Sequence, residues 1–352
     1  MIALEEKFLV NILYRPASEL LNGVDINNIN FEKLITLASD HLMLPALFFN
    51  IQKKKAAYLF PEDFIDYIKN IFAINKARNE ILLEEAKELS ELLVENNIKH
   101  LFLKGTALLL SNVFEDIGER MIGDIDFIIQ GKDEEKIKKV LEKNKYCSKK
   151  PFSSFRLFRH RHLPRRVNKN KIIAIEPHLK LLDARYRCAF NTKRLLNDFN
   201  EGLETIKTPR QSFLFDHCVY NFQINDHGFI NAKHSHRSIY DIYKLDCKKS
   251  LTIKNSRKDI YVKHFFLNIE KFNIFNLQLP SSFWSIYHDK CLRILMFIFI
   301  KILTVNERYS NKILILIQLL YNNELRKRAL NKIRIHYHHK TLLKHTYRWL
   351  IG

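Results

Sequence analysis

The chain is poor in residues that break or cross-link a fold: its 352 residues include 8 glycines, 8 prolines and 5 cysteines. It has no internal repeat, no low-complexity segment and no linker rich in glycine and proline, so its domain borders are not marked by composition. The cysteines are scattered singly along the chain, without Cys-x-x-Cys spacing: Cys147, Cys188, Cys218, Cys247 and Cys291. This spacing argues for a reducing compartment and against a structural zinc site.

Long apolar runs are also missing. The runs at residues 294–302 and 313–320 are shorter than the roughly 18 to 20 uncharged residues that span a bilayer, and Lys301 interrupts the first. We therefore expect buried helices there and no transmembrane segment. The first residues, MIALEEKFLV, carry early acids and no sustained apolar stretch, so we expect no signal peptide and a cytoplasmic location.

Positive charge is in excess. The 58 Lys and Arg against 38 Asp and Glu give a formal net charge of +20, which predicts attraction to RNA, DNA, nucleotides or an anionic membrane surface. A Lys-rich proteome is the alternative explanation, because Lys, Asn and Ile abound in this chain. Basic residues are concentrated in two segments. One is the tail from Arg326 onward, and the other lies within residues 152–171 and includes Arg156, Arg159, Arg161, Arg165 and Arg166. The sequence gives no signal for an oligomeric state.

The basic stretch at residues 152–171 lies between two predicted strands. It is a candidate wall for a triphosphate or for a polyanionic acceptor such as RNA, and a solvated hairpin is the alternative. His160-x-His162 lies within it, but no third ligand at suitable spacing supports a metal site there.

The hydrophobic content of 47% is enough for a sizeable core. Apolar residues at helical spacing predict helices within residues 31–50 and 63–95, with Glu84, Glu85, Glu88 and Glu91 on a solvated face. Residues 212–225 and 233–245 also predict helices, which carry a buried His217 and an Asp241 in need of a partner, while His234-x-His236 is expected at the surface. We predict an α+β fold with a small mixed sheet: helical residues 1–95, a core of residues 96–185, and helical residues 186–352 with the basic tail.

Chemistry is concentrated in residues 100–129. An apolar strand leads into the turn Lys104-Gly105-Thr106, and a short helix and a loop with Arg120 precede a second strand bearing Asp124 and Asp126. Because side chains alternate along a strand, the two carboxylates point the same way, about 7 Å apart. Such a pair makes a divalent-metal site, whereas two acids exposed at a strand end are the alternative. The glycine turn opening a helix, together with Lys104, suits phosphate oxygens.

A third acidic position follows on the predicted strand KIIAIE, residues 171–176, which ends at Glu176. Pro177 removes a backbone donor, so the strand either ends there or lies at a sheet edge. If it continues, His178 lies on the same face as Glu176.

These motifs in this order resemble a bacterial branch of the nucleotidyltransferase superfamily related to DNA polymerase β. The residues that carry the resemblance are Leu103-Lys104-Gly105, Arg120, Asp124-Ile125-Asp126-Phe127-Ile128-Ile129 and Glu176-Pro177-His178, within about residues 90 to 250. Thr106 departs from the Ser or Gly of the wider superfamily but keeps a hydroxyl, and Pro177 departs within the third acidic motif.

The resemblance implies that an acceptor hydroxyl attacks the α-phosphorus of a nucleoside triphosphate and that pyrophosphate leaves. Asp124, Asp126 and Glu176 would bind Mg²⁺ or Mn²⁺ and carry catalysis, and Lys104, Gly105, Thr106 and Arg120 would bind the nucleotide. The acceptor is open: RNA such as tRNA, a protein or a small metabolite.

Two other classes remain. A metal-dependent glycosyltransferase could use Asp-x-Asp with a nucleotide sugar, but it would need a nucleotide-binding α/β half upstream, where this chain predicts helices. A catalytically silent protein that binds nucleic acid or a partner through the same fold would be favoured by a misplaced Glu176.

Overall fold

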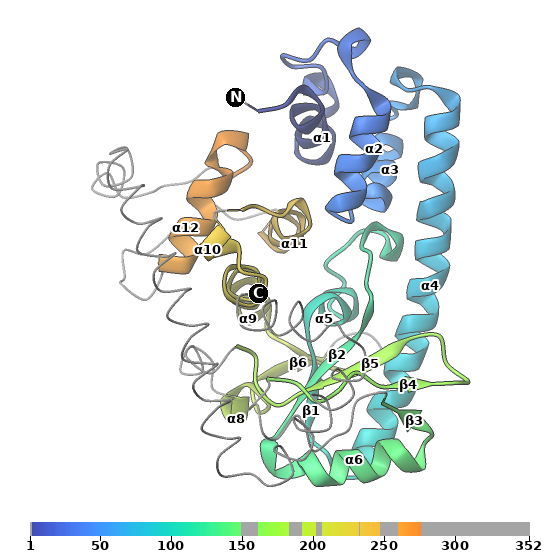
Figure 1. Ribbon diagram of the computed structural model, residues 1–352, viewed down its shortest axis with the longest axis vertical. Helices are drawn as coiled ribbons and strands as arrows, with labels where there is room; N and C mark the ends of the chain where they lie inside the picture. Colours follow the sequence, from blue (N-terminus) through green and yellow to red (C-terminus); the bar gives the residue numbers. More distant parts are fainter. Residues whose placement is uncertain are drawn as a thin grey trace, which may run out of the picture. The chain divides into compact units, whose positions relative to one another are not determined.

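The computed structural model describes residues 2–148, 161–182, 192–201, 206–231, 233–246 and 260–275, which belong to one compact unit, Met1–Ile286. Helices predominate and the strands form small sheets, which confirms the predicted α+β class (Figure 1). Arg156, Arg159, His160, the two C-terminal apolar runs and the basic tail lie outside the described residues. The predicted division at residues 95 and 185 stays a prediction.

Four α-helices precede the first strand: α1 (Leu4–Tyr14), α2 (Phe31–Asp40), α3 (Leu44–Lys53) and α4 (Glu62–Glu95). The helical prediction for residues 31–50 is confirmed, but as two helices, because Leu42 between them adopts a left-handed φ of 56°. In the described part of the chain, no single helix is long and apolar enough to cross a membrane; α2 and α3, bent by 119° at their break, pass that test only together.

A three-stranded sheet forms the centre of the predicted core, in the order β1 (His100–Phe102), β2 (Asp124–Ile129) and β5 (Ala174–His178). β1 runs antiparallel to β2, and β5 runs parallel to it, so the sheet is mixed as predicted. Helix α6 (Glu134–Lys143) lies in the crossover from β2 to β5 and buries Ile137, Val140 and Leu141. In this register Asp126 pairs with Glu176.

Pro177 lies inside β5 without breaking its pairing with β2. Ile175 and Pro177 direct their backbone groups away from β2: Ile175 exchanges hydrogen bonds with Arg166, and the carbonyl of Pro177 accepts from the N–H of Leu163 at 2.7 Å. The donor that proline lacks therefore belongs to the outer side of the strand. This placement explains how β5 continues to His178 and keeps Glu176 beside β2.

Other described elements lie beside this sheet or pack with the N-terminal helices. Helix α9 confirms the predicted buried helix with His217, and α11 confirms the helix with Asp241. These elements are β3 (Tyr146–Cys147) paired with β4 (Val167–Asn168), β6 (Phe199–Glu201) paired with β7 (Lys207–Pro209), and the helices α5 (Lys104–Leu110), η4 (Ile117–Glu119), α8 (Thr192–Leu195), α9 (Gln211–Tyr220), η8 (Asn221–Asn225), α10 (Gly228–Asn231), α11 (His236–Asp246) and α12 (Ile260–Ile269).

Two apolar clusters share helix α4, which reaches from the N-terminal helices to the sheet (Figure 1). In the first, Phe8 of α1 belongs to the same buried cluster as Tyr240 of α11 and Phe266 of α12. In the second, Phe127 of β2 clusters with Leu89 of α4. The N-terminal helices thus share a core with helices more than 200 residues later.

Glu85 of α4 corrects one prediction, because it is buried instead of solvated. Its carboxylate accepts the backbone N–H groups of Ile172 and Ile173 at 2.9 and 3.2 Å, just before β5. A carboxylate with four acceptor sites can satisfy two such donors at once. Glu85 therefore fixes the start of the strand that carries Glu176.

Changing Glu85 to Gln should lower the free energy of unfolding by about 1 to 3 kcal/mol, because one buried N–H loses its acceptor. The exposed Glu84 changed to Gln is the matched control and should stay within about 0.5 kcal/mol of wild type. Urea unfolding followed by circular dichroism measures both. Equal stability of the two variants would show that the contacts of Glu85 are dispensable.

The expectation that His234 and His236 lie at the surface is wrong for His236, which is fully buried. Both rings contact Glu6 of α1: its Oε1 lies 2.7 Å from Nε2 of His234 and 3.2 Å from Nε2 of His236. The ring of His41, just after α2, packs edge-on against His236. Burial, together with the neighbouring histidines, lowers the pKa of His41 to about 4, and burial lowers the pKa of His236, so both rings are neutral near pH 7.

A buried histidine on α12 predicts sensitivity to acid. Burial lowers the pKa of His264 to about 4 from its ordinary value of 6.5. The unfolded chain therefore binds a proton at a higher pH than the folded chain does, and stability falls as the pH drops from 6.5 toward 4. Between about pH 7.5 and about pH 4.5, the free energy of unfolding should fall by about 2 kcal/mol less in His264→Gln than in wild type. Urea unfolding at the two pH values measures the difference. An identical loss in both proteins would contradict this assignment.

Candidate active site

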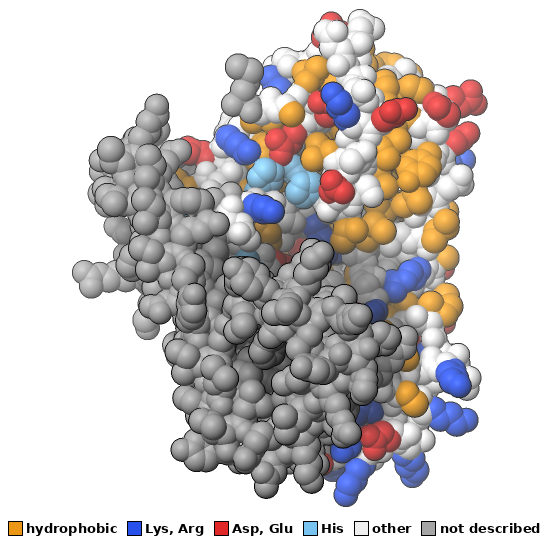
Figure 2. Space-filling view, in the orientation of Figure 1, with side chains coloured by type: hydrophobic (Ala, Val, Ile, Leu, Met, Phe, Trp, Pro, Cys, Tyr) orange, Lys and Arg blue, Asp and Glu red, His pale blue; other side chains and the backbone are white. Residues whose placement is uncertain are grey.

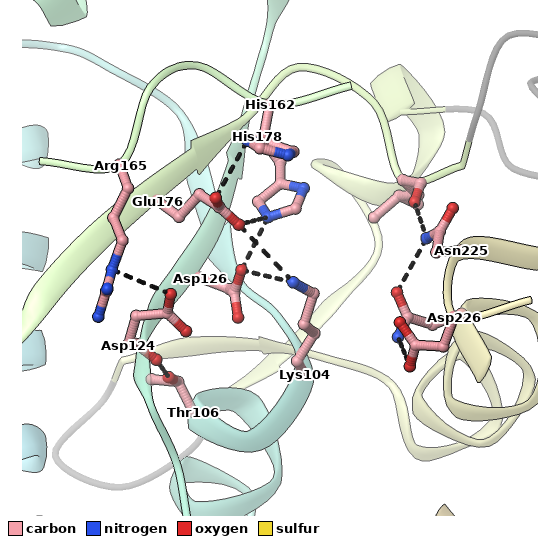
Figure 3. A network of polar contacts seen from close by, with 12 residues as sticks. Lys104, Thr106, Asp124, Asp126, His162, Arg165, Glu176, His178, Asn225 and Asp226 are labelled. Atoms are coloured by element: carbon pink, nitrogen blue, oxygen red, sulfur yellow. Dashed lines mark hydrogen bonds and ion pairs between the residues drawn. The ribbon is translucent and has the colours of Figure 1, made fainter. Parts of the chain in front are cut away.

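Lys104 opens helix α5 directly after β1, at the edge of the sheet where β2 begins. Its φ of 51° is left-handed, a conformation that costs a non-glycine residue about 1 to 2 kcal/mol. Its Nζ lies 2.7 Å from Oδ1 of Asp126 and 3.9 Å from Oε2 of Glu176 (Figure 3). A strained backbone thus carries the cation that faces two of the predicted catalytic carboxylates.

Asp126, Glu176 and His178 form the centre of the site. Nε2 of His178 lies 2.8 Å from Oδ1 of Asp126 and 3.3 Å from Oε2 of Glu176. One potential ligand atom from each of the three residues lies within 4.8 Å of the others. Figure 3 shows the three side chains converging from β2 and β5. The parallel register thus brings the third carboxylate beside the Asp-x-Asp strand.

These groups set each other's protonation. Burial would raise the pKa of Asp126, but the hydrogen bond with His178 and the charge of Lys104 hold it below its ordinary value. Burial also acts to raise the pKa of Glu176, and contacts with His178 and His162 lower it. In turn, burial opposes protonation of His178, while both carboxylates raise its pKa above the ordinary value. Both carboxylates are therefore ionised near neutral pH.

Asp124 begins β2 on the same face as Asp126, but it is not part of the three-residue cluster. Its Oδ2 lies 3.5 Å from Nε of Arg165. Burial, together with the charges of Asp126 and Glu176, raises the pKa of Asp124 to about 6. The site thus places a third carboxylate in the negative field of the other two.

In the segment before β4, which was predicted as a basic wall of the site, one of the arginines is buried. The side chain of Arg165 is 56% exposed, whereas that of Arg166 is 3% exposed and donates to the carbonyl of Tyr146 at 3.0 Å. Arg166 is therefore a structural residue and does not offer its charge to a ligand at the surface. His162 brings Nδ1 within 3.0 Å of Oε1 of Glu176, so this segment reaches the site from the outer side of β5.

Arg120 is buried and paired with Asp241, which gives that aspartate the partner expected for it. Nε and Nη2 of Arg120 donate to the two carboxylate oxygens at 2.7 and 2.9 Å, a bidentate arrangement. Asn75 and Asn79 of α4 both donate to the carbonyl of Arg120. The loop that leads into β2 is therefore tied to α4 and α11, two helices that are distant in sequence.

A cavity of about 190 Å³ opens beside these groups. This volume is below the roughly 300 to 1,000 Å³ of typical ligand pockets, so it suits part of a nucleotide such as its phosphates. A larger cavity of about 570 Å³ near Gln130 and Leu181 has no carboxylate pair among the described residues that line it. The smaller cavity is lined by Lys104, Gly105, Arg120, Met121, Ile122, Gly123, Asp124, Asp126, His217, Cys218, Asn221, Asp226, Arg237, Ser238 and Asp241.

Gly105 and Thr106 have different positions relative to this cavity. Gly105 lines it, and a Cβ atom there would lie 2.8 Å from Cγ1 of Ile122, so a side chain would not fit without movement. Thr106 is buried, and its hydroxyl donates to the carbonyl of Asp124 at 3.4 Å. Thr106 thus holds the first residue of β2.

Sequence reasoning left several of these residues out of the predicted site. His178 had a local signal, because its spacing of two from Glu176 places both on one strand face. His162 had only the weak His-x-His pattern, and Asp226 and Arg237 had no local signal, because they reach the cavity from segments distant in sequence.

The residues present fit a divalent cation. Mg²⁺ and Mn²⁺ prefer oxygen ligands, and burial together with the charges of Asp126 and Glu176 raises the pKa of Asp124, so a cation would favour its ionised form. Nδ1 of His178 is also buried without a hydrogen-bond partner among the residues described, leaving Nε2 as the nitrogen directed at the carboxylates. Asp126 and Glu176, which converge with His178, could therefore hold the ion, and Asp124 lies on the same face of β2.

An α+β fold in which parallel strands bring acidic side chains together beside a cationic helix start is the architecture expected of a nucleotidyltransferase. Residues 27–250, more than half of the chain, match the model of a family described as uncharacterised nucleotidyltransferase. The chain therefore belongs to this nucleotidyltransferase family. A comparison with curated proteins found no match.

Proposed function

We propose that the protein transfers a nucleoside monophosphate from a nucleoside triphosphate to an acceptor hydroxyl, with Mg²⁺ or Mn²⁺ as cofactor. The observation that carries this proposal is the register of β2 and β5, which pairs Asp126 with Glu176 and sets both beside Lys104. Membership of the nucleotidyltransferase family supports the same reaction class.

In this proposal Asp124, Asp126 and Glu176 hold the divalent cation, which would neutralise phosphate charge and lower the pKa of the acceptor hydroxyl. Both Asp126 and Glu176 are held ionised by their neighbours, so they are ready to act as ligands at neutral pH. His178 keeps the two carboxylates oriented through its contacts with both.

The cations that line the cavity would bind the triphosphate. Lys104 and the half-buried Arg237 both border it, and Gly105 lets a phosphate approach the start of α5 without a side chain in the way. Arg120 and Thr106, predicted as nucleotide ligands, are assigned positioning roles instead. Arg120 is engaged by Asp241, and Thr106 holds the carbonyl of Asp124.

The two alternative classes are less well supported. A glycosyltransferase would need a nucleotide-binding α/β half before Asp-x-Asp, and the elements before β1 are helical. A silent binding protein was favoured by a misplaced Glu176, but Glu176 pairs with Asp126.

The test is incubation of the protein with α-labelled nucleoside triphosphates, Mg²⁺ or Mn²⁺, cellular RNA, protein and small metabolites, followed by separation of the three acceptor classes. We expect label in one fraction, dependent on the metal and absent with the Asp126→Asn variant. The exposed Glu84→Gln variant is the control and should transfer label normally. No metal-dependent label in any fraction would contradict the proposal.

An RNA acceptor predicts a further dependence on salt. Contacts between phosphates and basic side chains release counterions, so RNA binding should weaken steeply from low to physiological salt. The double variant Arg161→Ala with Arg165→Ala should reduce the slope of log affinity against log salt by up to about two if both side chains contact phosphates. Arg166 is buried, so it is not mutated in this experiment. A flat dependence measured by filter binding would favour a protein or small-molecule acceptor.

A further inference from the structure

A second group of possible metal ligands lies away from the carboxylate site. It consists of His41 after α2, His234 just before α11 and His236 at the start of α11, and Glu6 in the first turn of α1 contacts two of these rings. One potential ligand atom from each histidine lies within 4.8 Å of those of the other two. Figure 2 shows histidine side chains together at the surface on this face, close to the N-terminal helices.

The chemistry of this group differs from that of the first cluster. Three imidazole nitrogens are ligands that zinc and similar transition ions accept, whereas Mg²⁺ prefers oxygen alone. Oε1 of Glu6 lies 2.7 Å from Nε2 of His234 and 3.2 Å from Nε2 of His236, so this carboxylate holds both rings. A carboxylate that accepts the second ring N–H is the usual outer partner of a metal-binding histidine.

One atom in the group has no structural explanation. Nδ1 of His236 is buried without a hydrogen-bond partner among the described residues, although the ring is 0% exposed. Buried polar atoms are nearly always satisfied, and an ion is one way in which an orphan is explained. The ring of His41 lies 4.8 Å, centroid to centroid, from that of His236.

We propose that His41, His234 and His236 form a site for a transition-metal ion, with Zn²⁺ as the ion best matched and Glu6 as the outer partner that orients two of the rings. Tetrahedral zinc with ligands at about 2.0 to 2.1 Å holds them roughly 3.4 Å apart. The three histidine ligand atoms lie within 4.8 Å of one another, so side-chain rotation of about an ångström brings them to that separation. Three protein ligands leave the fourth position of the ion to water.

Such a site would connect segments that are remote in sequence. The ion would fasten the end of α2 to the start of α11, the helix that carries Arg237 and Asp241 at the cavity, and Glu6 holds α1 to two of the same rings. The ion would therefore stabilise one wall of the active site without contacting the nucleotide. This role does not depend on the proposed reaction.

The experiment measures zinc on the full chain, purified without a polyhistidine tag and dialysed against metal-free buffer. Elemental analysis should find one zinc per chain, and added Zn²⁺ should raise the melting temperature by a few degrees. In His41→Gln and His234→Gln, zinc affinity should fall at least about 100-fold. Losing an outer hydrogen-bond partner of a ligand already costs up to about that much, and each of these variants loses a ligand itself. Circular dichroism checks that each variant is folded.

Two controls locate the ion. His227→Asn removes an exposed histidine and should keep the zinc, and Asp126→Asn should keep it as well. Co²⁺ in wild type should show the intense visible absorption of a four-coordinate site, which decides the question even if a histidine variant does not fold. Zinc retained in both histidine variants, zinc lost in Asp126→Asn, or no tight zinc and no such Co²⁺ spectrum in wild type would each overturn the proposal.

Discussion

Asn in place of Asp124 should reduce nucleotidyl transfer at least about 10³-fold and leave the free energy of unfolding unchanged or about 1 kcal/mol higher. The activity is lost because a negative ligand for the divalent cation is removed. Stability is kept because burial and the charges of Asp126 and Glu176 raise the pKa of Asp124 to about 6, so its ionised form is disfavoured in the folded protein. Transfer of labelled nucleotide and urea unfolding in a chelator measure the two effects.

Asp126→Asn is the informative comparison. It should abolish transfer to a similar degree but lower the free energy of unfolding by about 1 to 3 kcal/mol, since Lys104 and His178 lose a charged acceptor in a buried position. The two neighbouring aspartates thus have opposite expected effects on stability. Normal transfer by Asp124→Asn, with Mg²⁺ present, would remove Asp124 from the active site.

The second large effect is expected at the pair of Arg120 and Asp241. Asp241→Ala should lower the free energy of unfolding by about 3 to 5 kcal/mol, because the guanidinium group stays buried without its bidentate partner. Arg120→Met should be costly for the same reason. The double variant Arg120→Met with Asp241→Leu should be more stable than Asp241→Ala, since it leaves no unpaired charge.

A double-mutant cycle in urea, built from Arg120→Met, Asp241→Leu and their combination, measures this pair. We expect a coupling free energy of about 1 to 3 kcal/mol between the two side chains. Strictly additive single changes would show that the ion pair contributes no specific stability. The exposed pair of Lys53 and Glu115 is a suitable control and should couple by less than about 1 kcal/mol.

Local periodicity was enough to predict how the acidic side chains lie on their strands. The alternation of β2 puts Asp124 and Asp126 on one face, and β5 pairs Glu176 with Asp126 in the same sheet. Each strand was predicted from residues near one another in sequence. The resemblance supplied the roles of the side chains.

Predictions failed where a side chain finds its partner far along the chain. Glu85 has the helical position of a solvated residue, and its burial depends on backbone donors 87 and 88 residues later. His236 follows a polar segment, and its partner Glu6 is 230 residues away. Such pairings are set by tertiary packing, which no local pattern in this chain records. Arg120 lines the cavity, and its pairing with Asp241, 121 residues later, is a further contact of this kind.

The core shared by the two ends of the described chain has a consequence for synthesis on the ribosome. Tyr14 contacts the backbone of His236, 222 residues later, and Arg15 donates to the carbonyl of Phe272, 257 residues later. Helices α1 to α3 therefore emerge long before the surface that covers them, and loop closure over such separations slows folding. The apolar faces of the N-terminal helices stay exposed until the later helices have been synthesised, so we expect chaperones to bind the nascent chain.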